Sequence, residues 1–202
     1  TGAPTVLLHL LRYLKSKRGE VQFEVMLKSG GPLEHEFASL APTYVSNIKS
    51  SRVSRSIFKM LRMLNAPASL QGKGKIRLPG DKRFDVIFAN SIVSCDLAVE
   101  LKKQLHIPVV LYVHELEVGI RQFCGLDKFE KAKGAMDFII GSSKMVVDNL
   151  KKNHDIPEVK LGLIYDFIPA NEYYEKRMDF DVKEIRNMLC IPHDAFVVGS
   201  SG

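Results

Sequence analysis

An unbroken hydrophobic run, PVVLYV, occupies residues 108–113 of the chain. A strand that is hydrophobic at every position, without alternation, is typical of a parallel sheet buried on both faces. A second run of this kind, FDVIFA, occupies residues 84–89. Ligands of open α/β sheets bind beyond the carboxyl ends of the strands. The polar residues that directly follow the two runs are therefore the first candidates for a site: Asn90, Ser91, His114 and Glu115.

The other hydrophobic positions alternate between helical and extended patterns along the chain. We expect helices at 5–15, 33–40, 92–105, 116–132, 144–153 and 182–189, and strands at 21–27, 43–48, 137–140, 159–165 and from 196 onward. Strands that alternate with helices predict an α/β fold with a mainly parallel sheet, and right-handed crossovers make it doubly wound. The first helix is hydrophobic nearly all round, so we expect it to be buried, with His9 packed in the core.

The two ends of the chain suggest a domain organisation. A fold of this kind normally opens with a strand, so we expect the first strand of the sheet to be missing. The strand expected from residue 196 is read as the beginning of a truncated second domain. The expected division is a domain at 1–170, a linker and helix at 171–195, and the start of a second domain at 196–202.

Positive charge is concentrated in one segment. The net charge of the chain is +6, yet residues 49–83 contain ten Lys and Arg residues and one acid. An amphipathic helix is expected at 52–65, with hydrophobic residues on one side and a basic quadrant on the other. This basic quadrant consists of Arg52, Arg55, Lys59 and Arg62.

Three interpretations of the basic quadrant remain open. It is either a solvated surface or a face that docks on an anionic membrane, and these two are of similar weight. Nucleic acid is the third and weakest: Phe58 is the one interleaved aromatic residue, and no RNA- or DNA-binding motif is visible, so no nucleic-acid partner is predicted.

Composition narrows the class of protein. A hydrophobic content of 46% and a charged content of 26% are globular values. No hydrophobic run approaches the roughly 20 residues that a membrane span needs. The three cysteines, Cys95, Cys124 and Cys190, are far apart in the sequence and match no metal-ligand spacing, so no metal is expected and the cytoplasm is the expected location.

The ordered set of motifs resembles the N-terminal half of a retaining GT-B glycosyltransferase of family 4, whose N-terminal domain is a Rossmann-like α/β domain. The residues at 1–4 resemble its glycine loop, with Thr1 in place of the first glycine, and 84–91 resembles its "DVIhaHs" strand, with Asn90 where histidine is common. Further resemblances are 107–115 to "IPVVLTVHE", 137–143 to "aDrvIavS", 163–169 to "vIyNGID" and 191–202 to "IPeDAFVVGfvG". Asp166 and Phe167 depart from the fifth motif, where asparagine and glycine are usual.

This resemblance implies a two-domain enzyme and a division of labour. The nucleotide-sugar donor would be held mainly by a second domain and the saccharide or lipid-linked acceptor mainly by this one, with the donor as substrate and no separate cofactor. The family's basic donor-binding residues and its EX7E motif would lie beyond residue 202, so we expect the chain alone to be inactive. Polysaccharide, lipopolysaccharide or glycolipid synthesis at the inner face of the cell membrane is the implied process.

The resemblance also assigns roles to the candidate residues. His114 is the expected catalytic residue, because a histidine can donate to a sugar hydroxyl or a phosphate at neutral pH. Gly2 and Ala3 open a helix, and free amides and the helix dipole attract phosphate at such a position. Asn90, Ser91 and Glu115 are expected on the acceptor side, although Glu115 equally suits a cap of the following helix. Ser142 and Ser143 are expected to be helix caps instead of ligands.

Two alternatives remain beside the transferase. One is a GT-B sugar-nucleotide epimerase, which would share the fold and the donor. The other is a non-enzymatic Rossmann-like module that docks on anionic membrane through the basic quadrant. A basic pair and two glutamates eight residues apart in a following domain would favour the transferase over both.

Overall fold

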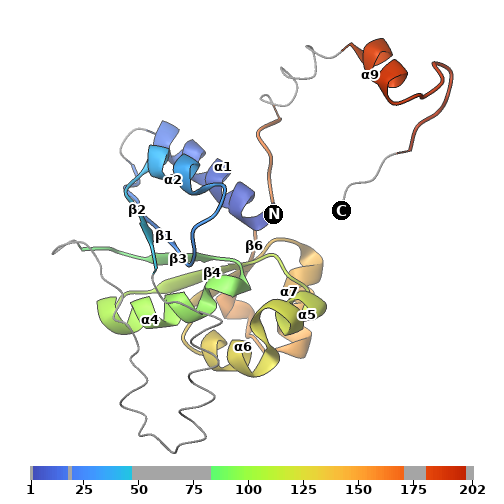
Figure 1. Cartoon of the computed structure of the whole chain (residues 1–202). Coiled ribbons are helices and arrows are strands. Elements are labelled where there is room, and N and C mark those ends of the chain that lie inside the picture. Colours follow the sequence, from blue (N-terminus) through green and yellow to red (C-terminus); the bar gives the residue numbers. More distant parts are fainter. Residues whose placement is uncertain (1, 18–19, 47–82, 171–180, 199–202) are drawn as a thin grey trace, which may run out of the picture. The chain divides into compact units, whose positions relative to one another are not determined.

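The computed structural model describes residues 2–17, 20–46, 83–170 and 181–198 (Figure 1). The chain divides into two units, residues 1–166 and residues 167–202, and each is described by itself. The basic quadrant expected at 52–65 lies outside the described residues.

The larger unit is built on a parallel sheet of four strands. These are β3 (Ile87–Asn90), β4 (Val109–Val113), β5 (Phe138–Gly141) and β6 (Leu161–Leu163), in the order β3-β4-β5-β6. The registers pair Asn90 with Tyr112 and Val113 with Gly141, so the carboxyl ends of neighbouring strands lie together. A second, two-stranded parallel sheet pairs β1 (Val25–Leu27) with β2 (Thr43–Val45). The expected α/β architecture with parallel strands is confirmed.

Helices cover the sheet on both sides. Figure 1 shows α4 (Cys95–Leu105) and α6 (Leu126–Lys133) on one side of β3 and β4, and α1 (Gly2–Ser16) and α2 (Glu34–Leu40) on the other. The main hydrophobic core lies between the sheet and the helices α4, α6 and α7 (Lys144–Asn153). It contains Val109, Leu111, Val113 and Phe129, each at 0% exposure. An unbroken hydrophobic run fits β4, because four of its five residues are buried.

A smaller core lies between α1 and α2. It consists of Leu8, Leu11, Val25 and Phe37, all buried. His9 is 8% exposed on the same helix, which confirms the expectation that it is a packed interior residue. Burying the apolar side of α1 fixes where its amino end lies, and that end is part of the candidate site.

The helix expected at 116–132 is interrupted. The chain forms a short turn α5 (Glu117–Gly119), then a π-helical segment η3 (Ile120–Cys124), then α6. The break falls at Gly125, whose φ of 86° lies in the left-handed region that glycine tolerates. Similarly, a 3-10 turn η2 (Ile92–Ser94) precedes α4, and a 3-10 turn η4 (Glu158–Lys160) takes the start of the strand expected at 159–165.

The smaller unit contains α9 (Val182–Met188), which is capped by Asp181 through the amides of Lys183 and Glu184. The strand expected from residue 196 is wrong as far as residue 198, since residues 196–198 form no strand and Phe196 is 93% exposed. A strand needs a neighbour for its backbone hydrogen bonds, and no other strand is present among the described residues of this unit. None of the helices that the structure describes is long and apolar enough to cross a bilayer.

Candidate functional site

The carboxyl ends of β3 and β4 bring Asn90 and His114 into contact. Asn90 Nδ2 donates to the carbonyl oxygen of Ala3 at 2.9 Å, which turns Asn90 Oδ1 toward His114 Nε2, also at 2.9 Å. Because an amide oxygen only accepts, His114 Nε2 carries the hydrogen in this contact. The structure thus brings together two side chains that the sequence places at the ends of different strands.

The other nitrogen of His114 faces a carboxylate. His114 Nδ1 lies 3.0 Å from Asp166 Oδ1, and the His114 side chain is only 10% exposed. Both ring nitrogens of His114 therefore have polar side-chain partners, the amide of Asn90 and the carboxylate of Asp166. The site therefore holds a nearly buried histidine with a carboxylate beside it.

Tyr112 forms a hydrogen bond with Asp166. Its hydroxyl lies 2.9 Å from Asp166 Oδ1 and 2.9 Å from the carbonyl oxygen of Ile164. Burial, and after it the hydrogen bond and charge of Asp166, raise the pKa of Tyr112, so the phenol stays neutral and able to donate. Its ring also packs against the His114 ring, with centroids 4.3 Å apart.

Ser91 and Glu115 form a second contact between the same two strand ends. Ser91 Oγ donates to Glu115 Oε1, and Glu115 Oε2 accepts from the amides of His114 at 3.0 Å and Ile92 at 3.4 Å. Ser91 has φ 69°, which is unfavourable for a residue with a side chain, and strain of this kind gathers at functional sites. Glu115 does not cap the following helix, because the N-cap of α5 is Leu116 and no side chain caps it; that alternative is wrong.

The amino end of α1 reaches the same edge of the sheet. The helix begins at Gly2, and the hydrogen bond from Asn90 to the carbonyl of Ala3 ties its first turn to β3. A Cβ placed on Gly2 would meet no atom within 4 Å, so the space beside this end of the helix is open. The residues expected to bind phosphate and the expected catalytic histidine are therefore joined through one side chain, Asn90.

Asp166 is the site residue that the sequence reasoning did not assign a role. It was noted only as a departure from the motif at 163–169, yet it touches both His114 and Tyr112. Its position soon after β6, at the same carboxyl edge of the sheet as the ends of β3 and β4, is the signal that points to it. Ser143 behaves as expected: its hydroxyl accepts from the amide of Val146 at 3.2 Å and caps α7.

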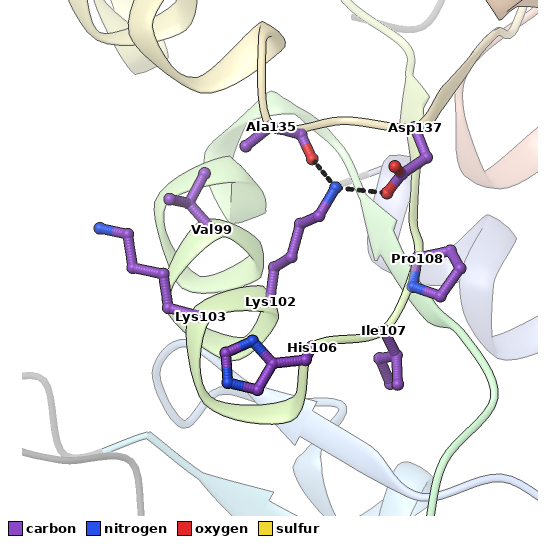
Figure 2. Close-up of a pocket in the computed structure, with 8 residues that line it drawn as sticks. All are labelled: Val99, Lys102, Lys103, His106, Ile107, Pro108, Ala135 and Asp137. Carbon is purple, nitrogen blue, oxygen red and sulfur yellow. Dashed lines mark hydrogen bonds and ion pairs between the residues drawn. The ribbon is translucent and has the colours of Figure 1, made fainter.

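A cavity of about 600 Å³ lies at the opposite edge of the sheet, beside the residues that precede β4 and β5. Figure 2 shows Lys102 reaching from α4 to the carbonyl of Ala135 and to Asp137, at 2.7 and 2.6 Å. Asp137 also accepts from the amide of Val109, so these polar groups bind one another. The cavity is thus remote from the candidate site, and we assign it no role in catalysis. Its lining consists of Val99, Lys102, Lys103, His106, Ile107, Pro108, Ala135 and Asp137.

Among the residues that the structure describes, no group of three or more His, Cys, Asp or Glu side chains is placed to bind a metal ion. The candidate site instead offers an imidazole, a helix amino end and amide, hydroxyl and carboxylate groups. These are groups that bind phosphates and sugar hydroxyls.

Comparison with known proteins agrees with this chemistry. A search of curated proteins found no match to the chain. A protein-family model, described as Glycosyltransferase Family 4, matches residues 1–172, which include every described residue of the candidate site. The chain therefore belongs to Glycosyltransferase Family 4.

Proposed function

We propose that this chain supplies the acceptor-side domain of a retaining GT-B glycosyltransferase that uses a nucleotide-sugar donor. The observation that carries the proposal is the junction at Asn90, which binds Ala3 at the start of α1 and His114 at the end of β4. This supports the proposal that a helix end able to bind phosphate and a side chain able to stabilise charge lie beside each other. Transfer from a sugar nucleotide requires both, because negative charge develops on the leaving diphosphate.

Each residue has a proposed role in this reaction. The amides of Gly2 and Ala3 contact the donor phosphate at the helix end. His114 contacts the donor sugar and stabilises the charge that develops at the reacting centre. Asn90 and Ser91 face the acceptor, and Glu115 acts on the acceptor side by holding Ser91 in its unusual backbone conformation.

The acceptor is proposed to be a saccharide or a lipid-linked saccharide, as in polysaccharide, lipopolysaccharide or glycolipid synthesis. The proposal for a lipid-linked acceptor rests on the basic quadrant, whose four cations would hold the protein at the anionic inner face of the cell membrane. The four residues are Arg52, Arg55, Lys59 and Arg62.

The test is turnover of UDP-glucose, UDP-N-acetylglucosamine and GDP-mannose by the full-length protein, including the donor-binding domain that the proposal requires, with saccharide acceptors. Turnover is followed by mass spectrometry and by NMR of the anomeric proton. We expect one donor to be consumed, with a glycosylated acceptor that keeps the donor's anomeric configuration. An inverted product would overturn the retaining mechanism. An epimerised sugar nucleotide without transfer would favour the epimerase, and no change in any donor would leave the non-enzymatic module as the better account.

A further inference from the structure

Two thiols that are far apart in the sequence, Cys95 and Cys124, lie in contact in the segments that follow the candidate-site strands. Cys95 is the first residue of α4 and is 0% exposed, while Cys124 is the last residue of η3 and is only partly buried. Their sulfur atoms are 3.4 Å apart. Both belong to the hydrophobic core or pack against it. They lie 29 positions apart in the sequence, and their spacing alone does not indicate a contact.

We propose that Cys95 and Cys124 form a reversible oxidation site that closes to an intramolecular disulfide. A disulfide needs an S–S distance near 2.05 Å, so the two sulfurs must approach by roughly 1.3 Å. The chain is adapted to a small shift at Cys124, because η3 ends there and Gly125 follows with φ 86°. The interior around Cys95 is apolar, and a disulfide, which carries no hydrogen-bond donor, is accommodated there.

The surroundings of the two sulfurs give them different roles. Burial raises the pKa of Cys95 to about 12, and the hydrogen bond and charge of Cys124 act in the same direction. Cys95 therefore stays protonated, and its burial keeps oxidants away. Lys128, whose ammonium is held by Asp96 at 2.7 Å, places positive charge where it acts on both sulfurs. Cys124, the more accessible sulfur beside this cation, is the one that meets the oxidant first.

The oxidant we propose is a peroxide, and the chemistry balances in two steps. The Cys124 sulfur attacks one oxygen of hydrogen peroxide, which breaks the O–O bond and gives a sulfenic acid and water. The Cys95 sulfur then attacks the Cys124 sulfur, the S–O bond breaks, and the hydroxyl leaves with the Cys95 proton as a second water. The two thiols lose two electrons in total, and a dithiol reductant returns them.

The disulfide would join two segments that lead directly from the candidate site. One segment, η2 and α4, follows Ser91, and the other, α5 and η3, follows Glu115. The disulfide would therefore link the two segments whose starting points are already joined by the Ser91–Glu115 hydrogen bond. Cross-linking restricts the unfolded chain, so the oxidised protein is expected to melt at a higher temperature than the reduced one. The inference does not depend on the identity of donor or acceptor.

The experiment uses the Cys190→Ser protein, which lacks the exposed third thiol, treated with stoichiometric hydrogen peroxide. We expect the intact mass to fall by two hydrogen atoms, and a tryptic map to show the peptides of Cys95 and Cys124 joined. Both changes should reverse with dithiothreitol. A mass gain of oxygen atoms without a cross-link, or two thiols that remain free in the native protein while peroxide oxidises a small free thiol, would overturn the proposal.

Two further variants in the same background separate the roles of the sulfurs. In Cys95→Ser, dimedone should label Cys124 after peroxide, because the sulfenic acid has no thiol to attack it. In Cys124→Ser, Cys95 should remain unlabelled. Equal labelling of Cys95 in the second variant, with an unchanged circular dichroism spectrum, would refute the order of events.

Discussion

The hydrogen bonds of Glu115 should contribute measurably to the stability of the fold, independently of any catalytic role. Its carboxylate accepts from Ser91 Oγ and from the amides of His114 and Ile92. Glu115→Gln keeps one acceptor oxygen but removes the charge and turns an NH₂ group toward one of these donors. A hydrogen bond to a charged group is worth about 1.5–3 kcal/mol. We expect Glu115→Gln to lower the free energy of unfolding by about 2 kcal/mol.

A double-mutant cycle in urea measures this contact directly. The variants are Glu115→Gln, Ser91→Ala and the double mutant, with Glu20→Gln on the exposed surface as the matched control. For a domain of this size, a loss of about 2 kcal/mol corresponds to a fall of roughly 4–8 °C in Tm. The control should stay within about 0.5 kcal/mol of the wild type.

The interaction energy decides the outcome of the cycle. Residues that share a hydrogen bond couple by about 0.5–3 kcal/mol, and independent sites add within about 0.5 kcal/mol. We expect Ser91→Ala to cost less in the Glu115→Gln background than in the wild type. Strict additivity would refute the view that Glu115 holds Ser91 in place.

Three other predictions concern the rest of the chain. The hydrogen bonds from Lys102 and from the Val109 amide hold the pKa of Asp137 below its usual range, so the stabilisation is present above the unfolded pKa of about 3.9 and is lost as pH falls toward the folded pKa. Urea titrations should therefore show that the stability advantage of wild type over Asp137→Asn shrinks below pH ~4. A difference that stays constant with pH would contradict the assignment. Gly141→Ala should lower stability by about 1–3 kcal/mol, because its Cβ would lie 2.7 Å from a methyl carbon of Val147, whereas Gly134→Ala, which meets no atom within 4 Å, should leave Tm nearly unchanged; equal Tm values would contradict the close packing. The quadruple variant Arg52→Gln, Arg55→Gln, Lys59→Gln and Arg62→Gln should bind phosphatidylglycerol vesicles more weakly than wild type, by up to about 4 kcal/mol in binding free energy. The difference, measured by co-sedimentation, should be smaller at high salt. Wild-type protein that stays in the supernatant at low salt would contradict the membrane proposal.

The parallel strands were predictable because burial on both faces leaves a distinctive run of hydrophobic residues. β4 lies within such a run and four of its five residues are buried, whereas β3 overlaps the run at 84–89 but buries only Ala89. The polar residues at or directly after both strand ends lie in the candidate site. The edges of elements were less predictable. The pattern at 116–132 is helical throughout, and hydrophobic spacing does not distinguish an α-helix from the π-helical turn that ends at Cys124, just before Gly125.

Contacts between distant positions were the part of the site that the sequence did not reveal. Asp166 pairs with His114 across 52 positions, and Cys95 meets Cys124 across 29. Nothing in the local pattern of either partner indicates the other, since the pairing depends on the order of strands and on where η3 ends. The strand-end rule restricts the candidates for the first pair, but no comparable rule applies to the second.

The central claim is that the edge of the sheet at Asn90 and His114 is where sugar transfer takes place. The most direct measurement is the steady-state turnover of the donor by the full-length enzyme as wild type, as His114→Ala and as the control His35→Ala, which changes an exposed histidine on α2. Tm is recorded for each. Losing a contact that stabilises the transition state typically costs about 10²–10³ in rate. The account predicts a fall of this size in kcat for His114→Ala alone, while His35→Ala keeps the wild-type rate. A His114→Ala protein with near-normal kcat and a sharply lower Tm would contradict the claim and show His114 to be a structural residue.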